Sequence, residues 1–422
     1  MNHRYPQPVP APPNARVERL GSGRFRFFPQ QNPIDGPLHG PALRDSLRVA
    51  ARDLGISAIG FASADAFVEA RAALRRWLEV GHAGTMHYLF DQGDRADPRR
   101  LLEPAASLVS VAVALEPPSS DAQQKLPLFG QIARYATTED YHRTLRLRLQ
   151  ELGQLVADRV GRPVLGRICV DTAPLLEREA ARRSGLGFVA KSTMLIVPGI
   201  GPQVLLGTLL VDVDLGEESP RAPRCGRCTA CLDICPTKAL VGPYWLDARR
   251  CIAYLTIEYR GWIDRELRGQ MGTFVFGCDL CQAVCPFDRS STPATPSATS
   301  TRGTSVDLGA WLWLTASDYR RLARSSPIGR ATREQLARNA AVALGNTGEP
   351  GAIPILAQAL LRHRSPMVRG HSAWALGRFS LPEATEALER ALNCEADPRV
   401  LEEIQAALQA KEAEPVQGRA SG

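Results

Sequence analysis

Cysteines are the residues of this chain whose spacing most clearly predicts chemistry. Eight of the ten lie between residues 225 and 285, in two runs with one isolated member between them. The first run has the spacing C-x2-C-x2-C-x3-C-P, which is typical of chains that bind two iron–sulfur clusters. Eight thiolates are enough for two [4Fe–4S] clusters, because each cluster takes four. The pattern therefore predicts a segment that carries single electrons to another part of the protein.

The ligand sets follow from this arrangement, which is that of bacterial ferredoxins: the fourth cysteine of the run serves the other cluster. Zinc sites also use C-x2-C pairs, but they close at four ligands and do not need the C-x3-C-P ending. Disulfides would need an oxidising compartment, and no signal peptide is visible. We expect Cys169 and Cys394, outside the pattern, to be small buried residues. The predicted sets are Cys225, Cys228, Cys231 and Cys285 for one cluster, and Cys235, Cys251, Cys278 and Cys281 for the other.

The composition indicates a soluble globular protein. The 422 residues are enough for two or three domains, and 44% of them are hydrophobic and 23% charged. No stretch approaches the ~20 apolar residues of a membrane span. Free thiols and oxygen-sensitive clusters favour the cytoplasm, so we expect a cytoplasmic monomer that does not contact a membrane.

The net charge is +7, and much of the excess lies in the C-terminal part. Residues 318–378 contain ten Arg and three acidic residues, a local balance of +7. A basic surface of this kind suits a polyanion such as nucleic acid. The alternative is a solvated Arg-rich face in a chain that has only four Lys, and charge alone does not decide between them.

Residues 41–216 alternate helical and strand-like patterns. Apolar residues at helical spacing predict helices over residues 43–54, 64–80 and 141–160. Runs rich in Val and Leu predict buried strands over residues 107–115 and 203–211. The mixture predicts an α/β or α+β domain whose strand order the pattern does not give.

Composition and an internal repeat divide the chain into five parts. The first residues are rich in Pro and Gly and predict a disordered or loosely packed extension. Asn339–Gly345 aligns with His371–Gly377 at a shift of 32, and a weaker copy ends at Leu408. This period, with helical spacing inside each unit, predicts stacked helix pairs of the HEAT type. The predicted parts are an extension over 1–40, a domain over 41–216, a two-cluster domain over 217–290, a Ser/Thr/Pro linker over 291–310 and helical repeats over 311–412.

Three motifs in the first domain could serve a ligand, and each also has a plainer explanation. Asp171 precedes Pro174 and a predicted helix, so it is either a helix N-cap or an acid that supplies a proton. Residues 184–193 resemble a phosphate-binding loop in composition but lack the Walker A spacing, and a glycine-containing turn explains them equally well. His142 is more typical of a hydrogen-bonded structural residue than of a metal ligand.

Taken in order, these segments resemble the epoxyqueuosine reductase family. The resemblance spans residues 41–290, and the repeats match the longer members of the family. Thr138, Phe188, Ala190 and Ser192 depart from it, because the family usually has Gly, Trp, Gly and Asn there. The segments that carry the resemblance are Arg134–Ala136 with Asp140–His142, Val170–Thr172, Ser184–Gly187 with Lys191, the first cysteine run, Leu246–Cys251 with Tyr254–Glu258, and Gly277–Gln282 with Cys285–Pro286.

The resemblance implies a multidomain α+β fold: an α/β cobalamin-binding domain, a bacterial-ferredoxin-like domain with two [4Fe–4S] clusters, and C-terminal HEAT-like helical repeats. It implies an oxidoreductase that reduces epoxyqueuosine to queuosine at the wobble position of tRNA. Electrons from a donor such as a flavodoxin or ferredoxin would pass through the clusters to cobalamin, Asp171 would donate a proton, and the basic surface would hold the anticodon stem-loop. The cobalamin-binding residues that it implies are Arg95, Tyr135, Asp171, Lys191, Ser192, Thr193 and Asp279.

Two other functions would explain parts of the chain. A corrinoid enzyme similar to reductive dehalogenases would act on a small molecule with the same cofactors, but it has no need of an Arg-rich repeat array. A non-catalytic electron carrier on a repeat scaffold would leave the domain around Asp171 without a purpose.

Overall fold

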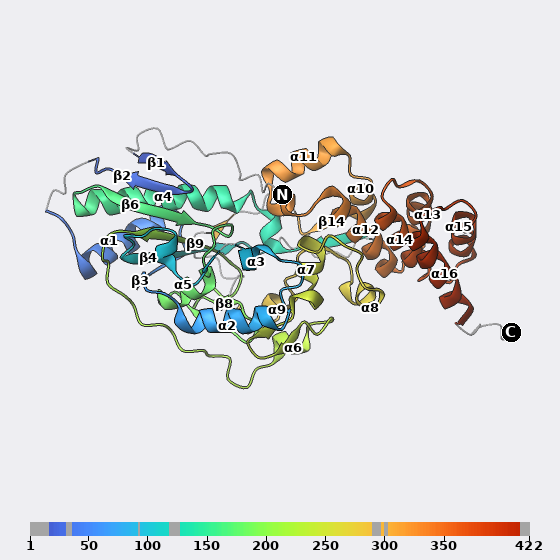
Figure 1. Ribbon diagram of the computed structural model, residues 1–422, viewed down its shortest axis with the longest axis horizontal. Helices are drawn as coiled ribbons and strands as arrows, with labels where there is room; N and C mark the ends of the chain where they lie inside the picture. Colours follow the sequence, from blue (N-terminus) through green and yellow to red (C-terminus); the bar gives the residue numbers. More distant parts are fainter. Residues whose placement is uncertain are drawn as a thin grey trace.

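The computed structural model describes residues 17–30, 36–91, 93–117, 127–288, 297–298 and 303–413. A sheet domain forms one end of the molecule and helical repeats form the other, with the cysteine segment between them along the lower edge (Figure 1). Within these ranges, no helix is both long and apolar enough to span a membrane.

The first domain is built around a seven-stranded sheet. Its strand order is β1-β2-β6-β9-β4-β13, and β3 also pairs with β4. Neighbouring strands are antiparallel, except that β13 is parallel to β4. Every residue of β4 is buried. The strands are β1 (Val17–Gly21), β2 (Arg24–Phe27), β3 (Ala58–Ser63), β4 (Ser107–Leu115), β6 (Val164–Cys169), β9 (Val204–Val211) and β13 (Ser297–Ala298).

Helices cover both faces of this sheet. On one face, α1 (Gly40–Asp53) and α4 (Tyr141–Val160) pack on each other and enclose a core that includes Phe27, Leu47 and Leu149. On the other face lies α5 (Glu177–Arg183), which contacts β3, β4 and β9. The three predicted helices and two predicted strands are confirmed as α1, α2 (Val68–Glu79), α4, β4 and β9.

The predicted N-terminal extension is wrong for residues 17–27, which form the hairpin β1–β2. Phe25 and Phe27 are 4% and 0% exposed, because β2 pairs with β6 and turns both rings toward the core under α4. The short Phe-x-Phe strand was not predicted, because the segment around it is rich in Pro and Gly. Residues 1–16 and 31–35 lie outside the described part of the chain.

The cysteine segment folds into short helices and one hairpin on the edge of the first domain. Trp77 of α2 connects the first domain to the cysteine segment, because its indole nitrogen donates to the Leu246 carbonyl at 2.6 Å. The elements are α6 (Ala230–Asp233), β10 (Leu240–Gly242), β11 (Trp245–Leu246), α7 (Ile252–Ile257), α8 (Arg265–Arg268) and α9 (Leu280–Ala283).

A second, three-stranded sheet joins the first domain, the cysteine segment and the predicted linker. Its central strand β5 (Phe129–Ile132) pairs in parallel with β12 (Phe274–Phe276) and antiparallel with β14 (Ser305–Asp307). The predicted linker is therefore wrong for residues 305–310, which form β14 and the start of α10 (Leu308–Leu312), and residues 297–298 form β13. Residues 289–296 and 299–302 are outside the described ranges.

The C-terminal helices stack as the internal repeat predicts. Helix α12 packs on α14 and α14 on α16, while α13 packs on α15. A Cβ on Gly345 would lie 2.7 Å from Cβ of Ala375, and one on Gly377 would lie 2.9 Å from Cβ of Ala407. The repeated glycine thus lets consecutive helices approach closely. The helices are α11 (Ala316–Ser325), α12 (Arg333–Thr347), α13 (Ala352–Arg362), α14 (Pro366–Leu376), α15 (Pro382–Leu392) and α16 (Pro398–Ala413).

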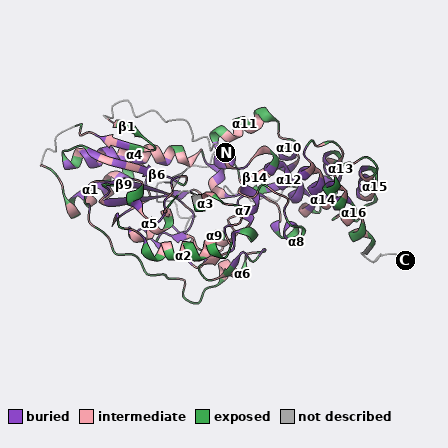
Figure 2. Ribbon diagram, in the orientation of Figure 1, coloured by how far each residue is buried: buried purple, intermediate pink, exposed green. Residues whose placement is uncertain are grey.

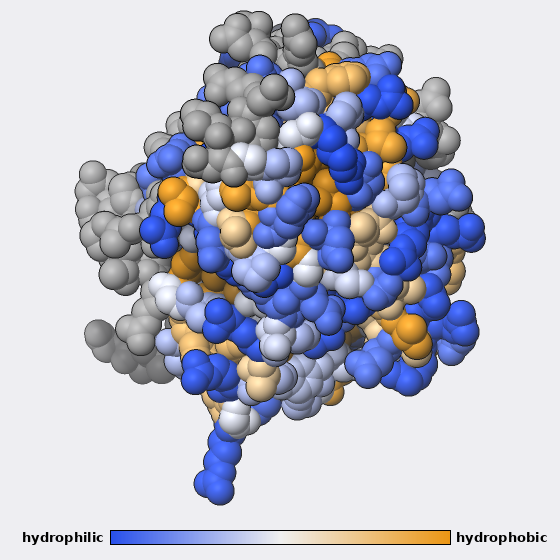
Figure 3. All heavy atoms as spheres, turned by 90° about the vertical axis from the view of Figure 1, so that its left-hand side faces the viewer, coloured by the Kyte–Doolittle hydropathy of each residue, from blue (hydrophilic) through white to orange (hydrophobic). Residues whose placement is uncertain are grey.

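The buried residues form separate cores in the sheet domain and in the repeats (Figure 2). The end of the sheet domain that faces the viewer in Figure 3 is mostly hydrophilic, with apolar side chains visible between the polar ones. A buried arginine joins the cysteine segment to the repeats. Arg338 of α12 donates to the carbonyls of Leu255 (2.6 Å), Tyr259 (2.8 Å) and Gly261 (2.7 Å). These hydrogen bonds hold α7 and the residues that follow it against the repeats.

Candidate active site and cluster-binding segment

Cysteines of the same predicted set influence one another's pKa, although the described residues contain no group of three or more cysteine, histidine or acidic side chains that could hold a metal ion. All ten cysteines are free thiols. In the first set, burial and the neighbouring charges of Cys225 and Cys228 raise the pKa of both Cys231 and Cys285. In the second set, burial raises the pKa of Cys278 to about 12, and Cys251 and Cys235 add to this rise. Cys281 likewise has Cys251 and Cys278 among the charges that raise its pKa after burial.

The first set lies nearer the surface than the second. Cys228 is exposed, and so are Arg224, Gly226 and Arg227 beside it. In the second set, Cys251 and Cys278 pack against a core that includes Leu255 and Met271. The first set is therefore the more accessible of the two from solvent.

Lys191 lies in the turn between β7 (Phe188–Val189) and β8 (Leu195–Ile196). Its ammonium group donates to the carbonyls of Gly226 (2.7 Å) and Cys228 (3.0 Å), so Lys191 holds the loop of the first cysteine set. Thr193, in the same turn, has a left-handed φ of 65° and accepts a 2.7 Å hydrogen bond from Arg178 through its carbonyl. Ser192 is only 6% exposed, and its hydroxyl oxygen accepts a 3.5 Å hydrogen bond from the Met194 amide.

Asp171 follows β6 and faces the N-terminus of α4. Its Oδ2 lies 3.1 Å from Nε2 of His142, and Nδ1 of His142 lies 2.7 Å from Oδ1 of Asp140. Asp140 is also the N-cap of α4, because the same Oδ1 accepts from the His142 amide at 3.0 Å. Asp171 itself is not a cap: the helix after Pro174 is α5, and its N-cap residue is Leu176, which makes no side-chain cap. With a carboxylate at each ring nitrogen, His142 is placed to be an imidazolium.

The backbone of Asp171 is strained, with φ of 55° in the left-handed region. Its amide donates to Oε1 of Glu177 at 2.9 Å, which fixes the bend after β6 against the first residue of α5. The Asp171 side chain is nevertheless 52% exposed. A strained residue that is held by several partners and still open to a ligand is typical of a functional position.

The site holds three coupled acidic or basic groups. Burial opposes a charge on His142, but hydrogen bonds to Asp140 and Asp171 outweigh it and raise its pKa to about 9. Partial removal from water likewise opposes ionisation of Asp171, but the hydrogen bond to His142 and the charges of Arg330 and Arg95 hold its pKa below the usual value. Burial and the charge of Asp171 raise the pKa of Glu177 to about 8. At neutral pH, His142 is therefore charged, Asp171 ionised and Glu177 protonated.

Aromatic rings form the walls around these groups. Tyr141 stacks on His142 at 4.2 Å between ring centroids, and Tyr135 meets Tyr141 edge-on at 6.1 Å. Burial, followed by the charge of Asp171, raises the pKa of both Tyr135 and Tyr141. Both phenols therefore stay neutral at physiological pH.

Arginines from two parts of the chain complete the site. The guanidinium carbons of Arg95 and Arg330 lie 5.5 and 5.4 Å from the ring centroid of Tyr88, which starts α3 (Tyr88–Asp91). Arg330, just before the repeats, makes a two-pronged ion pair with Glu258 at 2.9 and 3.2 Å. The sheet domain, the cysteine segment and the repeat region thus all contribute to the surroundings of Asp171.

The predicted cofactor residues fall into two places. Asp171 lies close enough to Tyr135 and Arg95 to affect their pKa values, whereas Lys191 reaches the first cysteine set. Asp279 connects the recess around Asp171 to the second set, because its Oδ2 accepts from the Arg134 amide at 2.5 Å, next to Tyr135.

Sequence reasoning missed Glu177 and Arg330. It took His142 for a hydrogen-bonded structural residue, which the bonds of its ring to Asp140 and Asp171 confirm. His142 and Glu177 were visible in the two motifs around Asp140 and Asp171, but only the fold brings the two motifs together. Arg330 has no local signal, since it reaches the site from beyond the cysteine segment.

The arginines of residues 318–378 do not form one uniform basic surface. Arg338 is fully buried, Arg330 pairs with Glu258, and Arg369 pairs with Glu395 at 2.6 Å. Part of the predicted positive charge is therefore internal. The exposed members are Arg320, Arg321, Arg324, Arg362, Arg364 and Arg378.

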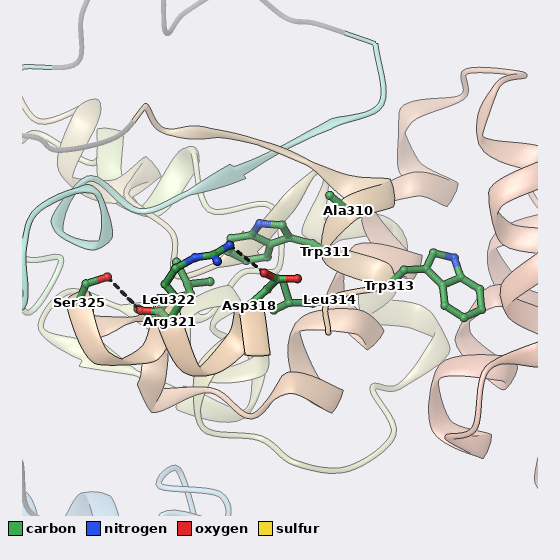
Figure 4. A pocket seen from close by; sticks show the side chains of 8 residues that line it. All are labelled: Ala310, Trp311, Trp313, Leu314, Asp318, Arg321, Leu322 and Ser325. Carbon is green, nitrogen blue, oxygen red and sulfur yellow. Dashed lines mark hydrogen bonds and ion pairs between the residues drawn. The ribbon is translucent and has the colours of Figure 1, made fainter. Parts of the chain in front are cut away.

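Three of these exposed arginines lie on α11, which borders an open hollow of about 760 Å³ (Figure 4). Trp313 is 37% exposed at this hollow. Arg321 pairs with Asp318 at 2.8 Å yet keeps 80% of its side chain exposed. Indole rings and guanidinium groups are the side chains that stack on RNA bases and bind phosphates. The hollow is lined by Ala310, Trp311, Trp313, Leu314, Asp318, Arg321, Leu322 and Ser325.

Three family models match successive parts of the chain. Residues 95–172 match the domain of epoxyqueuosine reductase QueG. Residues 224–288 match a 4Fe-4S double cluster binding domain, and residues 329–409 match HEAT repeats. The predicted two-cluster domain and the predicted repeat class are thereby confirmed.

Curated relatives and solved structures agree with these matches. An epoxyqueuosine reductase of Pseudomonas aeruginosa is 40% identical over 345 residues, which cover 80% of this chain and 94% of the relative. The Escherichia coli enzyme is 35% identical over 350 residues, with 81% and 91% covered. A selenomethionine-labelled epoxyqueuosine reductase superposes with a TM-score of 0.81 at 30% identity over 87% of this chain and 99% of that one. A structure of epoxyqueuosine reductase with an epoxyqueuosine-modified tRNA-Tyr stem loop gives 0.79 at 30% identity, with 88% and 99% covered. The chain belongs to the epoxyqueuosine reductase family.

Proposed function

We propose that this protein reduces epoxyqueuosine to queuosine in the anticodon loop of tRNA. The observation that carries the proposal is the Asp171–His142 pair, held at 3.1 Å with Tyr141 stacked on the imidazole. Relatives at 35–40% identity are epoxyqueuosine reductases, and a similar structure binds an epoxyqueuosine-modified stem loop. Family membership favours this activity over a small-molecule dehalogenation or a purely electron-carrying role.

We propose that the eight thiols of the two predicted sets are the ligands of two [4Fe–4S] clusters. The first set would receive electrons near Cys228, and the second would pass them to the recess. Lys191 acts here as a positioning residue, because its two hydrogen bonds fix the loop that carries Cys225 and Cys228. Asp279 similarly fixes the Arg134–Tyr135 segment against the second set.

The residues around the recess fit a large planar cofactor such as cobalamin. Tyr135 and Tyr141 contribute aromatic rings beside Asp171, and Ser192, in the Lys191 turn, keeps a buried hydroxyl proton for an acceptor. The half-exposed Asp171 carboxylate shows that space remains for a ligand beside it. When bound, cobalamin would supply a cobalt centre that takes electrons one at a time and acts on a carbon of the epoxide. Tyr135, Ser192, Thr193 and Arg95 are the residues that we propose to hold it.

The proton supply matches the reaction. Converting the epoxide to a double bond consumes two electrons and two protons, and the oxygen leaves as water. The Asp171–His142 pair holds one proton between Oδ2 and Nε2, and Glu177 holds another on its carboxyl group at neutral pH. We assign delivery of the first proton to Asp171. His142 and Glu177 then supply the proton that replaces it on Asp171, so the Asp171 carboxylate passes on a proton that the imidazolium has held.

The tRNA surface is proposed to include α11 and the hollow beside it. Arg320, Arg321 and Arg324 would bind phosphates, and Trp313 would stack on an unpaired base. The site is reached from this side, since Arg330 follows α11 and contacts Tyr88 in the recess. A tRNA substrate and free thiols support a cytoplasmic location, and we propose that the protein works as a monomer with a flavodoxin- or ferredoxin-type donor.

The proposal is tested by reconstitution. The protein is purified anaerobically, incubated with cobalamin, reduced with dithionite and mixed with an epoxyqueuosine-containing anticodon stem-loop. A UV–visible spectrum should show corrinoid and clusters together, and nucleoside mass spectrometry should show the loss of one oxygen atom. A preparation that carries both clusters but has no affinity for a corrinoid would overturn the proposal.

A further inference from the structure

We propose that a docking face for an acidic one-electron carrier protein lies over the first cysteine set. This donor face consists of Arg224, Arg227, Ile234, Val241 and Tyr244 around the exposed Cys228. The inference rests on the proposed function, because only a protein that consumes electrons needs such a donor. Its partner is identified by chemistry: a small protein with a negative surface around a centre that gives up single electrons.

The donor face is continuous and lies against the cluster ligands. The Tyr244 amide donates to the Lys191 carbonyl at 2.9 Å, and the Lys191 ammonium donates to the Gly226 and Cys228 carbonyls. The charge of Cys225 also contributes to the raised pKa of Tyr244, after burial. The hairpin that ends at Tyr244 and the loop of the first set therefore share one surface. Helix α6, which ends beside Ile234, packs on β10 of this hairpin.

Three large apolar side chains of the donor face are exposed to solvent. Ile234 is 41% exposed, Val241 53% and Tyr244 44%, although each belongs to a residue type that is usually buried or half-buried. Tyr244 also has a left-handed φ of 64° at the tip of the hairpin. Exposed apolar residues that are surrounded by polar ones are typical of protein–protein contacts. Phosphates of RNA would offer these aliphatic side chains no partner, so the observations favour a protein.

The charge around these residues is positive. Residues 221–244 contain three Arg and one Lys against a single carboxylate, Asp233, a net charge of +3. Within the described residues, no acidic side chain forms an ion pair with Arg224 or Arg227. Complementary charge of this kind accelerates the encounter with an acidic partner and makes the rate depend on salt. In Figure 1 the face lies at the lower edge near α6, away from α11 and the repeats.

The electron count sets what the donor must do. Each reduced carrier, such as a flavodoxin hydroquinone, gives one electron and becomes a semiquinone. Two encounters therefore supply the two electrons that one epoxide consumes, and the two clusters can store both. The donor binds briefly and leaves between encounters, which suits a small face with a few charges rather than a large apolar interface.

The test measures cluster reduction separately from turnover. The holoenzyme with oxidised clusters is mixed anaerobically, in a stopped-flow instrument, with reduced bacterial flavodoxin or with dithionite, and bleaching of the cluster absorbance is followed. The variants are Arg224→Glu/Arg227→Glu and Val241→Glu. Arg52→Glu/Arg159→Glu, with two exposed arginines on helices of the sheet domain, is the matched control. Iron content is measured for each protein.

We expect both donor-face variants to slow reduction by flavodoxin about 10-fold or more at low salt, the range of electrostatic steering, and to flatten its salt dependence. Reduction by dithionite, which needs no docking, should stay within about twofold, as should both rates of the control. Unchanged flavodoxin rates in both variants, or an equal slowing by dithionite, would overturn the inference. An equal loss of stem-loop affinity would assign the face to RNA instead and would also overturn it. If the dithionite-reduced wild type does not convert epoxyqueuosine, the proposed function is wrong. The donor face is tested separately, because the rates of cluster reduction by flavodoxin do not depend on turnover.

Discussion

Nε2 of His142 lies 3.1 Å from Oδ2 of Asp171, while Nδ1 of the same ring lies 2.7 Å from Oδ1 of Asp140. One imidazole thus links the N-terminus of α4 to the strained bend after β6. The link fixes the direction of the Asp171 carboxylate and keeps a proton beside it. Glu177, bound to the Asp171 amide, places a second proton within the same recess.

Replacing Glu177 by Gln should change the pH dependence of the reaction. Gln keeps an oxygen that can accept from the Asp171 amide but has no acidic proton. In the wild type, activity should fall as pH rises through about 8, where Glu177 loses its proton, and fall further through about 9, where His142 does. The activity of the variant should not decrease near pH 8. At pH 7 the variant should be about 10²-fold slower than the wild type, which is the lower end of the rate gain that general acid–base catalysis provides.

Single-turnover rates between pH 6 and 10 would show this. Glu179→Gln is the control, because Glu179 lies on the same helix and pairs with Arg182 outside the recess. Equal rates and an unchanged profile in Glu177→Gln would remove Glu177 from the proton supply.

His142→Ala should change the way in which stability depends on pH. The pKa of His142 rises on folding from 6.5 to about 9, so its contribution is fully present below pH 6.5 and is lost as pH rises through about 9. By linkage this contribution is about 3 kcal/mol. Urea unfolding at pH 6 and at pH 9.5 should therefore show a smaller difference in unfolding free energy for the variant than for the wild type. His39→Ala, at an exposed position, should leave the difference unchanged.

Cys251→Ala should remove one cluster and spare the other. Cys251 belongs to the second predicted set with Cys235, Cys278 and Cys281, so we expect about four irons per chain instead of about eight. Anaerobic iron analysis and the EPR spectrum of the reduced protein would report this. Cys394→Ala is the control, since Cys394 lies in the repeats and donates to the Arg390 carbonyl. Full iron content in Cys251→Ala would contradict the ligand sets.

Removing the arginines of α11 should weaken RNA binding uniformly across sequences. In Arg320→Ala/Arg321→Ala/Arg324→Ala, three exposed cations are lost, and the slope of log affinity against log salt should decrease by about 2. Fluorescence anisotropy with a labelled stem-loop at several salt concentrations measures the slope. A triple variant at Arg52, Arg75 and Arg76, which are exposed on the sheet domain, should keep the wild-type slope. Equal slopes for both triple variants would exclude α11 from the RNA surface.

Much of the fold was predictable because its signals are local. The cysteine spacing, the 32-residue repeat and the Val- and Leu-rich strand over residues 107–115 each depend on neighbouring residues alone, and each appears as predicted. The hairpin β1–β2 was missed because Phe25 and Phe27 gain their burial from pairing with β6, which lies far along the chain. The same is true of β14, whose Ser-rich sequence becomes a strand only beside β5.

The site shows the same limit. Asp171 and the Asp140–His142 motif were each visible, but neither sequence says that the His142 ring reaches Asp171. Lys191 was assigned to a cofactor through resemblance, and its side chain instead reaches the cysteine loop at Gly226 and Cys228. Arg330 carries charge to the recess from beyond the cysteine segment. Such contacts arise from tertiary packing, which no local pattern records.

The central claim is that Asp171 delivers a proton during reduction of epoxyqueuosine. It is tested most directly by single-turnover conversion of an epoxyqueuosine stem-loop by cobalamin-loaded, dithionite-reduced wild type and Asp171→Asn, at equal iron and corrinoid content. Asn can still contact His142 but has no acidic group. We predict that Asp171→Asn binds the stem-loop normally and forms queuosine at least about 10²-fold more slowly. Queuosine formation at the wild-type rate in this variant would contradict the account.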